Sequence, residues 1–380
     1  MGSCKNQALE YDERGYGSIN SIVCADCFGD YSLKNFIELN GEVDECDYCK
    51  NEGLVVELEV IIGKIVDGIK FEYEDANGCM GWDGREGGFV GANTYDTYDL
   101  VREVLDDELN IECDDLEDDI ISCIHNINWC EKSPYEIREH QENYYRWKDF
   151  CNHVKEYNDN KFDGKSKLIL ETVLDTIKEL DLIKILEVDK AIYRVRKHNK
   201  SEVCNKSKDI GSAPKENAFE NRMSIQGESM FYGADDKNTA LVEAVGDHSE
   251  SITVGEFYPV KKLSVLDLSK IRDRKLPSLF DEENRVYRSP IIFLSKFALD
   301  VSKPLDDNDV NKYKPTQIFT KYLRENYRTI DGTNLDGLVY RSSKVEDGIC
   351  YCLFFDNDQC YDNKTSKNKG LWMKKIDIVK

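Results

Sequence analysis

The sequence predicts a mixed fold class, in which a helical N-terminal domain precedes an α/β (or α+β) domain. Its 380 residues are enough for two domains, each with its own core. The apolar pattern changes from helical spacing to alternation near residue 191. Charge divides the chain in a similar way. The first 150 residues hold 36 acidic and 12 basic side chains, whereas the remainder holds 38 and 39.

The N-terminal domain is expected to cover residues 1–160, with a compact cysteine-rich unit at 20–52. The stretch 75–94 is rich in Gly, Asp and Asn, which predicts a long loop. Ser133 and Pro134 are suited to the N-cap and first turn of a helix. Three stretches are predicted to be largely helical: 54–70, 96–124 and 134–158.

Residues 161–187 are expected to form a linker and a connecting helix. The polar run DNKFDGKS at 159–166 is the linker, and apolar residues recur on one face over 167–187. The second domain then covers 188–380. Its predicted strands are 191–195, 230–232, 263–268, 338–340 and 350–355, and its predicted helices are 239–245, 288–299 and 316–326.

Composition excludes several classes of partner. The excess of acid in the first domain should repel phosphate backbones, so no direct nucleic-acid binding is expected. No apolar run is long enough to span a membrane, and no signal-peptide pattern opens the sequence. Fourteen cysteines without such a signal favour a reducing compartment, so we expect a cytoplasmic protein with free or metal-bound thiols.

Two Cys-x2-Cys pairs are separated by 18 residues, a spacing typical of four-cysteine zinc sites. Four thiolates close a tetrahedral coordination shell, so this zinc would be structural. The alternative is two chance pairs of reduced thiols. The predicted ligands are Cys24, Cys27, Cys46 and Cys49. The other cysteines from residue 79 onward are expected to be small buried apolar side chains: Cys79, Cys113, Cys123, Cys130, Cys151, Cys204, Cys350, Cys352 and Cys360.

The stretch Asn221–Glu243 reads NRMSIQGESMFYGADDKNTALVE. It resembles the central motif of the RES family of bacterial toxins, in which a Gly-Arg turn leads into a strand ending in Tyr and then a helix carrying Glu. The family is named for an Arg, a Glu and a Ser. Their counterparts are Arg194 in IYRVR, Glu243 in TALVEAV and Ser342 in DGLVYRSS. Ser343 competes with Ser342 for the last position.

Two positions depart from the family pattern: Asn221 stands where relatives have Gly, and the following Asn of the family is Ser224 here or absent. Since Asn also tolerates left-handed backbone angles, we expect the turn to survive. Other segments resemble the family in the same order along the chain: 211–214, 263–268, 313–317 and 336–355.

The resemblance implies an α/β fold related to ADP-ribosyltransferases and an enzyme that cleaves the nicotinamide–ribose bond of NAD. Such cleavage passes through an oxocarbenium-like state, which a carboxylate stabilises. By resemblance, Glu243 is the catalytic carboxylate, Arg194 and Arg222 bind the phosphates, and Tyr232 lines the nicotinamide pocket. Ser342, or alternatively Ser343, would position the substrate.

The activity implied is NAD depletion, by hydrolysis or phosphorolysis, in a growth-arresting toxin or an antiphage effector. One alternative is a protein mono-ADP-ribosyltransferase, and a second is a non-catalytic binding module. An antitoxin or regulatory protein is an expected partner, and a homo-oligomer is possible on this interpretation.

The N-terminal region contains the pattern CADCFGDYSLKNFI followed by CDYC. From residue 20 to about 155 it resembles the HEPN/RES N-terminal domain that is often fused to RES domains. Some HEPN domains are ribonucleases with spaced Arg and His residues. Arg146 and His153 are seven positions apart and would share one helix face. A ribonuclease needs a basic approach path for RNA, so the favoured interpretation is a packing helix.

Overall fold

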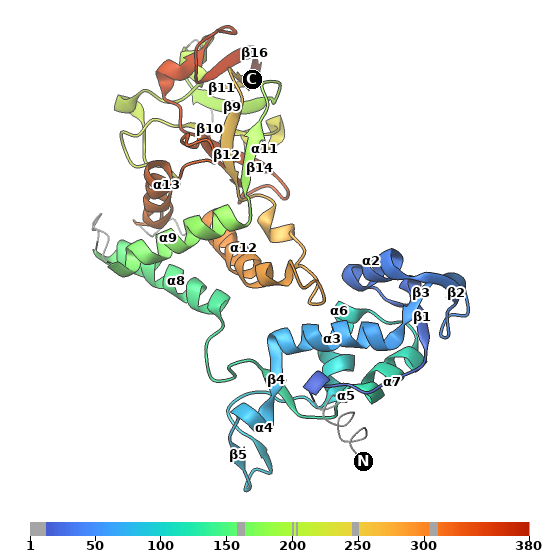
Figure 1. Ribbon diagram of the computed structural model, residues 1–380. Helices are drawn as coiled ribbons and strands as arrows, with labels where there is room; N and C mark the ends of the chain where they lie inside the picture. Colours follow the sequence, from blue (N-terminus) through green and yellow to red (C-terminus); the bar gives the residue numbers. More distant parts are fainter. Residues whose placement is uncertain are drawn as a thin grey trace, which may run out of the picture. The chain divides into compact units, whose positions relative to one another are not determined.

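The computed structural model describes residues 13–157, 164–199, 201–202, 204–244, 251–303 and 311–379. The chain divides into two compact units (Figure 1). The N-terminal unit contains Met1–Arg138 together with Leu276–Arg288, and the C-terminal unit contains Glu139–Lys275 together with Ser289–Lys380. The first unit is therefore built from two separate segments of the chain. The sequence instead predicts one continuous N-terminal domain that ends at residue 160.

The N-terminal unit combines a small antiparallel sheet of order β1-β3-β2 with several helices. Asp30 caps α2, because its side chain accepts hydrogen bonds from the backbone N–H groups of Ser32 and Leu33. The elements of this unit are β1 (Ile22–Cys24), η1 (Ala25–Cys27), α2 (Tyr31–Asn40), β2 (Glu42–Glu45), β3 (Glu52–Glu57), α3 (Leu58–Glu72), β4 (Tyr73–Asp75), α4 (Ala76–Cys79), β5 (Trp82–Asp83), β6 (Gly88–Phe89), α5 (Thr97–Asp99), η2 (Leu100–Val104), α6 (Asp106–Leu109), α7 (Asp114–Cys123), β7 (Trp129–Glu131) and η5 (Arg285–Tyr287).

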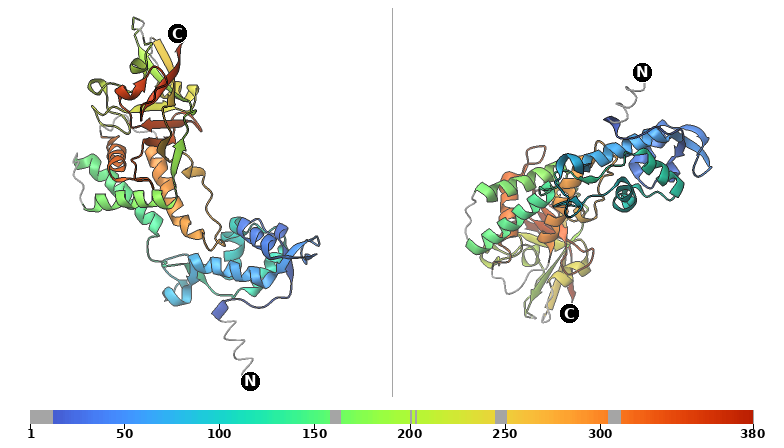
Figure 2. Two further views of the ribbon diagram at one scale, coloured as in Figure 1. Left: turned by 45° about the horizontal axis from the view of Figure 1, so that its top comes forward. Right: turned by 90° about the horizontal axis from the view of Figure 1, so that it is seen from below.

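Helix α3 runs through the core of this unit (Figure 2) and presents one apolar face to it. The segment Leu276–Arg288 completes that core, since Leu279 and Phe280 are buried in the same cluster. Gly68 allows the close approach, because a Cβ atom there would lie 2.6 Å from the ring of Phe280. At the end of the segment, Arg288 donates hydrogen bonds of 2.9 Å to Glu72 and 2.6 Å to Glu108.

The C-terminal unit is built on a nine-stranded mixed sheet of order β15-β16-β11-β9-β10-β14-β13-β12-β8. The β12–β13 and β15–β16 pairs are parallel, and the other pairs are antiparallel. Its strands are β8 (Ile183–Leu186), β9 (Ile192–His198), β10 (Phe231–Ala234), β11 (Ser251–Pro259), β12 (Leu263–Asp267), β13 (Gly337–Arg341), β14 (Ile349–Leu353), β15 (Cys360–Tyr361) and β16 (Leu371–Val379).

Helices pack beside this sheet, and aromatic side chains join them. Trp147 contacts Phe297 with ring centroids 4.8 Å apart, and Phe297 contacts Phe319 at 5.0 Å. These contacts explain why α8 belongs to the C-terminal unit. The helices of the unit are α8 (Glu139–Tyr157), α9 (Gly164–Glu179), α10 (Ser207–Ile210), η3 (Lys215–Asn217), α11 (Lys237–Ala244), η4 (Ile271–Asp273), α12 (Arg288–Ser302, of which all but Arg288 lies in this unit), α13 (Lys314–Asn326) and η6 (Asn357–Gln359).

The fold class is confirmed: the first region is largely helical, and the second carries a large mixed sheet. Several element boundaries were wrong. Residues 54–57 belong to β3, because they pair with β1 and β2 on either side. The helix predicted over 167–187 ends at Glu179, and Ile183–Leu186 pairs with β12 at the sheet edge.

Three other predicted segments also differ. The loop 75–94 contains α4 and the β5–β6 hairpin, and 96–124 is broken into short helices. Helix α8 begins at Glu139, and Ser133, which was predicted to be the N-cap, adopts a left-handed conformation with φ of 52°. Most of the linker predicted at 159–166 lies outside the described residues.

No helix in the part of the chain that the structure describes is both long and apolar enough to cross a membrane.

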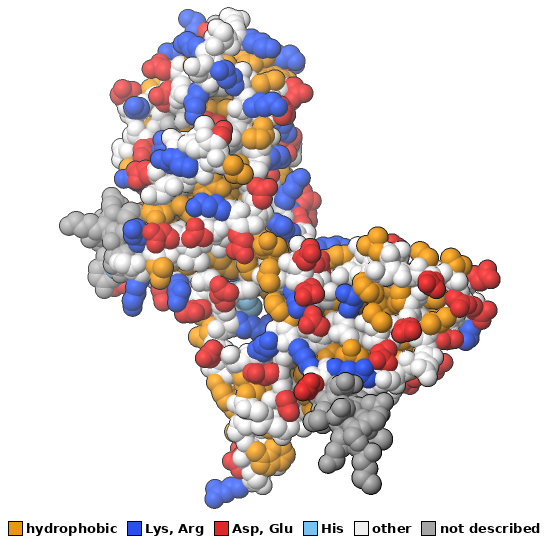
Figure 3. All heavy atoms as spheres, in the orientation of Figure 1, with side chains coloured by type: hydrophobic (Ala, Val, Ile, Leu, Met, Phe, Trp, Pro, Cys, Tyr) orange, Lys and Arg blue, Asp and Glu red, His pale blue; other side chains and the backbone are white. Residues whose placement is uncertain are grey.

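Strand β2 illustrates the acidic character of the N-terminal unit. All four of its residues are exposed, three of them are acidic, and acidic side chains stand out at that edge in Figure 3.

Candidate functional site

A pocket of about 490 Å³ opens in the C-terminal unit, within the size range of small-molecule sites. Its walls come from β9, β10, α11, β13, β14 and the loop before β10. The predicted site residues that line it are Arg194, Arg222, Tyr232, Glu243 and Ser343. Segments from Tyr193 to Cys350 therefore meet around one cavity.

Arg194 projects from β9 toward the neighbouring strand β10. Its Nε donates a 2.8 Å hydrogen bond to the carbonyl of Ile210, and its Nη1 donates one of 2.6 Å to the carbonyl of Tyr232. The guanidinium also lies 5.2 Å from the ring centroid of Phe231. Burial lowers the pKa of Arg194 to about 10. No carboxylate among the described residues forms an ion pair with it, so its charge is available to an anion.

The turn that carries Arg222 is held from two sides. Asn221 and Ser224 exchange backbone hydrogen bonds of 2.9 and 3.3 Å. The side chain of Gln317 reaches the same turn, with its Nε2 2.9 Å from the carbonyl of Asn221. Arg222 itself donates from Nη1 to the carbonyl of Val301 at 2.8 Å. The turn thus forms with Asn221 in place of Gly. Asn221 does not adopt a left-handed conformation, since the positive φ in this stretch, 84°, belongs to Gly227.

Helix α11 carries Glu243, and its first turn is fixed by Asp236, which accepts a 2.9 Å hydrogen bond from the backbone N–H of Thr239. The carboxylate of Glu243 meets the loop after β13. Ser342 Oγ donates a 2.5 Å hydrogen bond to Glu243 Oε1, and the Sγ of Cys350 lies 3.8 Å from the same oxygen. Burial, followed by the charge of Glu243, raises the pKa of Cys350, so this thiol stays protonated.

The hydroxyl of Ser342 has its hydrogen-bonding capacity filled. It accepts from the backbone N–H groups of Lys344 at 3.0 Å and of Val345 at 2.9 Å, and its single hydrogen points to Glu243. Ser342 is absent from the pocket lining, whereas Ser343 is part of it. The two serines therefore occupy different places: one contacts the carboxylate, and the other faces the cavity.

The pocket combines aromatic walls with positive charge. Tyr232 and Tyr340 line it, and burial raises the pKa of both hydroxyls well above the ordinary value. Ser224 shares a 2.8 Å hydrogen bond with the hydroxyl of Tyr232. Among the described lining residues, cations outnumber carboxylates: Arg194, Arg196, Arg222 and Lys344 against Glu228 and Glu243. Such a pocket suits an anionic ligand with a flat ring.

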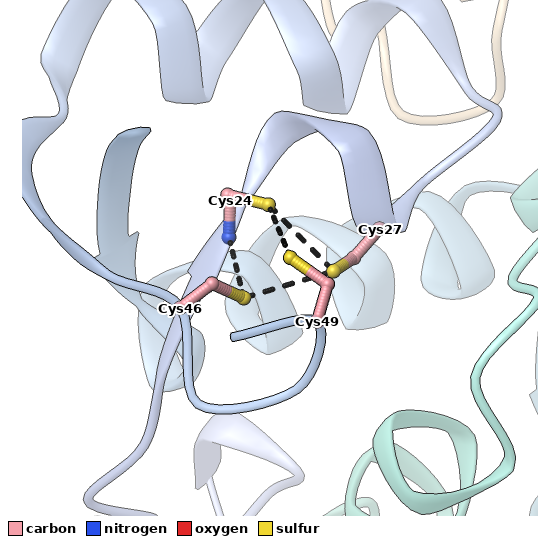
Figure 4. A group of neighbouring side chains, drawn as sticks. All are labelled: Cys24, Cys27, Cys46 and Cys49. Carbon is pink, nitrogen blue, oxygen red and sulfur yellow. Dashed lines mark hydrogen bonds between the residues drawn. The ribbon is translucent and has the colours of Figure 1, made fainter. Parts of the chain in front are cut away.

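The four predicted metal ligands also converge, in the N-terminal unit (Figure 4). Cys24 Sγ lies 3.7 Å from Cys27 Sγ and 3.4 Å from Cys49 Sγ, and Cys27 Sγ lies 3.7 Å from Cys46 Sγ. Tetrahedral zinc holds its sulfurs roughly 3.8 Å apart, given Zn–S bonds of about 2.3 Å. The cluster could therefore bind a metal ion with small adjustments.

Arg146 and His153, the residues considered for ribonuclease chemistry, lie on α8. The guanidinium of Arg146 donates a 2.5 Å hydrogen bond to Glu142 one turn earlier, which is an ordinary helix-surface ion pair.

Several residues of the site escaped sequence reasoning. Gln317, Lys344 and Cys350 contact the Arg222 turn or Glu243 from distant parts of the chain. The segment 313–317 was recognised as a matching stretch, but its contact with the turn at 221–224 depends on how α13 packs. No local pattern in a single sequence carries that information.

Comparison with protein families assigns both regions. Residues 39–163 match the model described as HEPN/RES N-terminal domain 1, and residues 191–372 match the model of the RES domain. The first match includes Cys46 and Cys49 and begins after Cys24 and Cys27. The comparisons with curated proteins and with solved structures gave no match.

Proposed function

Because this chain is a RES-domain protein with a HEPN/RES N-terminal domain, we propose that it cleaves the bond between nicotinamide and ribose in NAD. The observation that carries the proposal is the carboxylate of Glu243, which Ser342 orients at the edge of a cationic, aromatic pocket. Bond cleavage moves the bonding electron pair to the pyridine nitrogen, so nicotinamide leaves as a neutral molecule. The ribose is then left with oxocarbenium character.

Glu243 is the catalytic residue in this proposal. A carboxylate beside the ribose stabilises the growing positive charge, and it does so more effectively where water is largely excluded. The hydrogen bond from Ser342 fixes the direction of the carboxylate before the substrate arrives. Preorganisation of this kind lowers the barrier, because no reorientation is needed during the reaction.

The diphosphate of NAD would bind to the guanidinium groups of Arg194 and Arg222. Both residues use one Nη1 hydrogen on a backbone carbonyl, which holds each planar fork in place and leaves other donors free for phosphate oxygens. Tyr232 would form a wall for the nicotinamide ring, and Ser343 would hydrogen-bond the substrate from the lining.

The acceptor of the ADP-ribosyl group is water or phosphate in this proposal. Hydrolysis gives ADP-ribose and a proton, whereas phosphorolysis gives ADP-ribose carrying a new phosphate ester at the ribose carbon. Loss of cellular NAD would arrest growth, which fits a toxin or antiphage effector of the cytoplasm that an antitoxin or another regulatory protein restrains.

The four-cysteine cluster would hold a structural zinc ion. Four sulfur donors fill a tetrahedral shell and leave no position open for a substrate. The ion would tie the turn at Cys24–Cys27 to the turn at Cys46–Cys49, where the strands are short. We assign this metal a role in folding of the N-terminal unit and none in NAD cleavage.

The experiment is to incubate the full-length protein with NAD, with and without phosphate, and to identify the products by mass spectrometry. Release of nicotinamide with ADP-ribose, or with its phosphate ester when phosphate is present, supports the proposal. Nicotinamide release with ADP-ribose attached to an added protein indicates a mono-ADP-ribosyltransferase instead. Intact NAD at high enzyme concentration contradicts both and leaves a binding module.

A further inference from the structure

A second group of potential metal ligands lies in the N-terminal unit, outside the four-cysteine cluster. It consists of Glu74, Cys79 and Cys130. Glu74 on β4 and Cys130 on β7 are direct partners in the antiparallel pair, so their side chains leave the ladder on the same face. Helix α4 begins after Asp75, whose carboxylate caps it, and this turn returns Cys79 to the pair. Three potential metal ligands thus converge from β4, α4 and β7.

The distances favour a metal ion over a disulfide. Cys79 Sγ and Cys130 Sγ are 3.3 Å apart, close to the 3.4 and 3.7 Å edges of the four-cysteine cluster. A tetrahedral zinc ion requires roughly 3.8 Å between sulfurs, whereas a disulfide requires about 2.05 Å. The metal site therefore needs the smaller adjustment. The ligand atoms of all three residues lie within 4.8 Å of one another.

The charge around Glu74 points the same way. This residue is half-buried, and no Lys or Arg among the described residues forms an ion pair with it. Its Oε1 accepts a 2.9 Å hydrogen bond from the backbone N–H of Ser133, which orients the carboxylate. A half-buried carboxylate beside two thiols lacks a compensating cation, and a bound divalent ion would supply one.

We propose that Glu74, Cys79 and Cys130 bind a second divalent metal ion of the zinc type. Two sulfurs and one carboxylate oxygen suit zinc better than the harder magnesium or calcium. Three protein ligands leave the fourth coordination position for water. The ion clamps α4 against β7 and so fixes the base of the β5–β6 hairpin, which joins the rest of the unit nearby.

The test measures metal stoichiometry in the full-length protein, purified under reducing conditions, loaded with zinc and then desalted. Elemental analysis is expected to give two zinc equivalents for the wild type and one for Cys79→Ser or Glu74→Gln. The matched control is Cys113→Ser, because Cys113 is also a half-buried cysteine of this unit but lies outside both clusters. This control should retain two equivalents.

The first metal site is distinguished by Cys46→Ser, which should lose one equivalent while the second site stays loaded. Cobalt loading gives a further readout, since each thiolate-bound cobalt absorbs by charge transfer and the Cys79→Ser spectrum should lose one component. One zinc equivalent in the wild type, unchanged in Cys79→Ser and Glu74→Gln, would overturn the proposal. So would an intact mass showing that Cys79 and Cys130 form a disulfide. The wild-type stoichiometry decides the question even when a variant fails to fold.

Discussion

Ser342 donates its hydroxyl hydrogen to the carboxylate of Glu243 at 2.5 Å, although the two residues are 99 positions apart in the sequence. Two backbone N–H groups fill the acceptor side of the same hydroxyl. The direction of this hydrogen bond is therefore fixed by the loop that follows β13. In the proposed reaction, Ser342 acts through Glu243 as a positioning residue, and Ser343 faces the pocket.

Replacing Glu243 by Gln should abolish most of the activity. The amide keeps the size of the side chain but removes the charge that stabilises the oxocarbenium, a loss that typically costs roughly a hundredfold or more in rate. The measurement is the initial rate of nicotinamide release, with circular dichroism to verify folding. Glu346→Gln is the matched control, because this carboxylate is exposed in the neighbouring loop. A folded Glu243→Gln protein with near wild-type turnover would remove Glu243 from the mechanism.

The two serines should respond differently to alanine. Ser342→Ala removes a hydrogen bond to a charged group, worth about 1.5–3 kcal/mol, so kcat should fall by roughly tenfold to a hundredfold. Ser343→Ala removes a substrate contact and should mainly raise KM. Steady-state kinetics separate the two effects. Equal changes in both variants would contradict the distinct roles assigned to them.

The affinity for a diphosphate should fall as the pH rises through about 10. Burial depresses the pKa of Arg194 to that value, so the guanidinium is charged at neutral pH and loses its proton earlier than an ordinary Arg. Linkage has the opposite sign for stability: the buried charge costs stability below this pKa, and the cost is relieved at higher pH. Titration calorimetry with ADP between pH 8 and 11 measures the step. In Arg194→Gln, binding should be weaker and the step near pH 10 should vanish, whereas an unchanged step would contradict its assignment to Arg194.

Removing metal from the four-cysteine cluster should unfold the sheet β1-β3-β2 first. These strands are short, and all four residues of β2 are exposed, so apolar burial in this sheet is confined to a few residues of β1 and β3. Hydrogen exchange before and after chelation measures the loss of protection. The β13–β14 pair in the other unit is the internal reference and should keep its protection. Unchanged exchange in β1 and β3 after complete metal removal would show that the ion is dispensable.

Phe280→Ala should destabilise the N-terminal unit by about 3–5 kcal/mol, the usual cost of removing a buried aromatic ring. Phe280 packs on α3 at Gly68, so amide exchange in Leu58–Glu72 reports the effect directly. Leu276→Ala is the matched control, because Leu276 belongs to the same segment but is exposed. Equal protection of α3 in both variants would show that the segment is not part of that core.

Local signals in the sequence located much of this architecture. The alternating pattern found β9 and β13, and the paired Cys-x2-Cys motifs found the four thiols that converge. Resemblance to the RES family found Arg194, Arg222, Tyr232 and Glu243, which all line one pocket. These features depend on residues close together in the chain, or on a family pattern that already contains the fold.

Features that depend on long-range packing were missed. Strand β8 was predicted as part of a helix, because its apolar residues also fit a helical face and pairing with β12 decided the outcome. The contact of Gln317 with the turn at Asn221 required α13 to be placed first. Cys79 and Cys130 were predicted to be ordinary buried thiols. No local sequence pattern indicates that β4 pairs with β7 and so brings the two sulfurs together.

Because the segment Leu276–Arg288 lies far along the chain, the order of synthesis affects when the N-terminal unit can complete its fold. During translation, residues up to Arg138 emerge well before Leu279, Phe280 and Arg288, which fill the core around α3 and neutralise Glu72 and Glu108. Until much of the C-terminal unit has left the ribosome, the N-terminal unit therefore has an apolar gap in its core, and Glu108 lacks its Arg288 partner. A chain that ends prematurely before residue 276 has no complete N-terminal unit, which makes it a natural target for quality-control proteases.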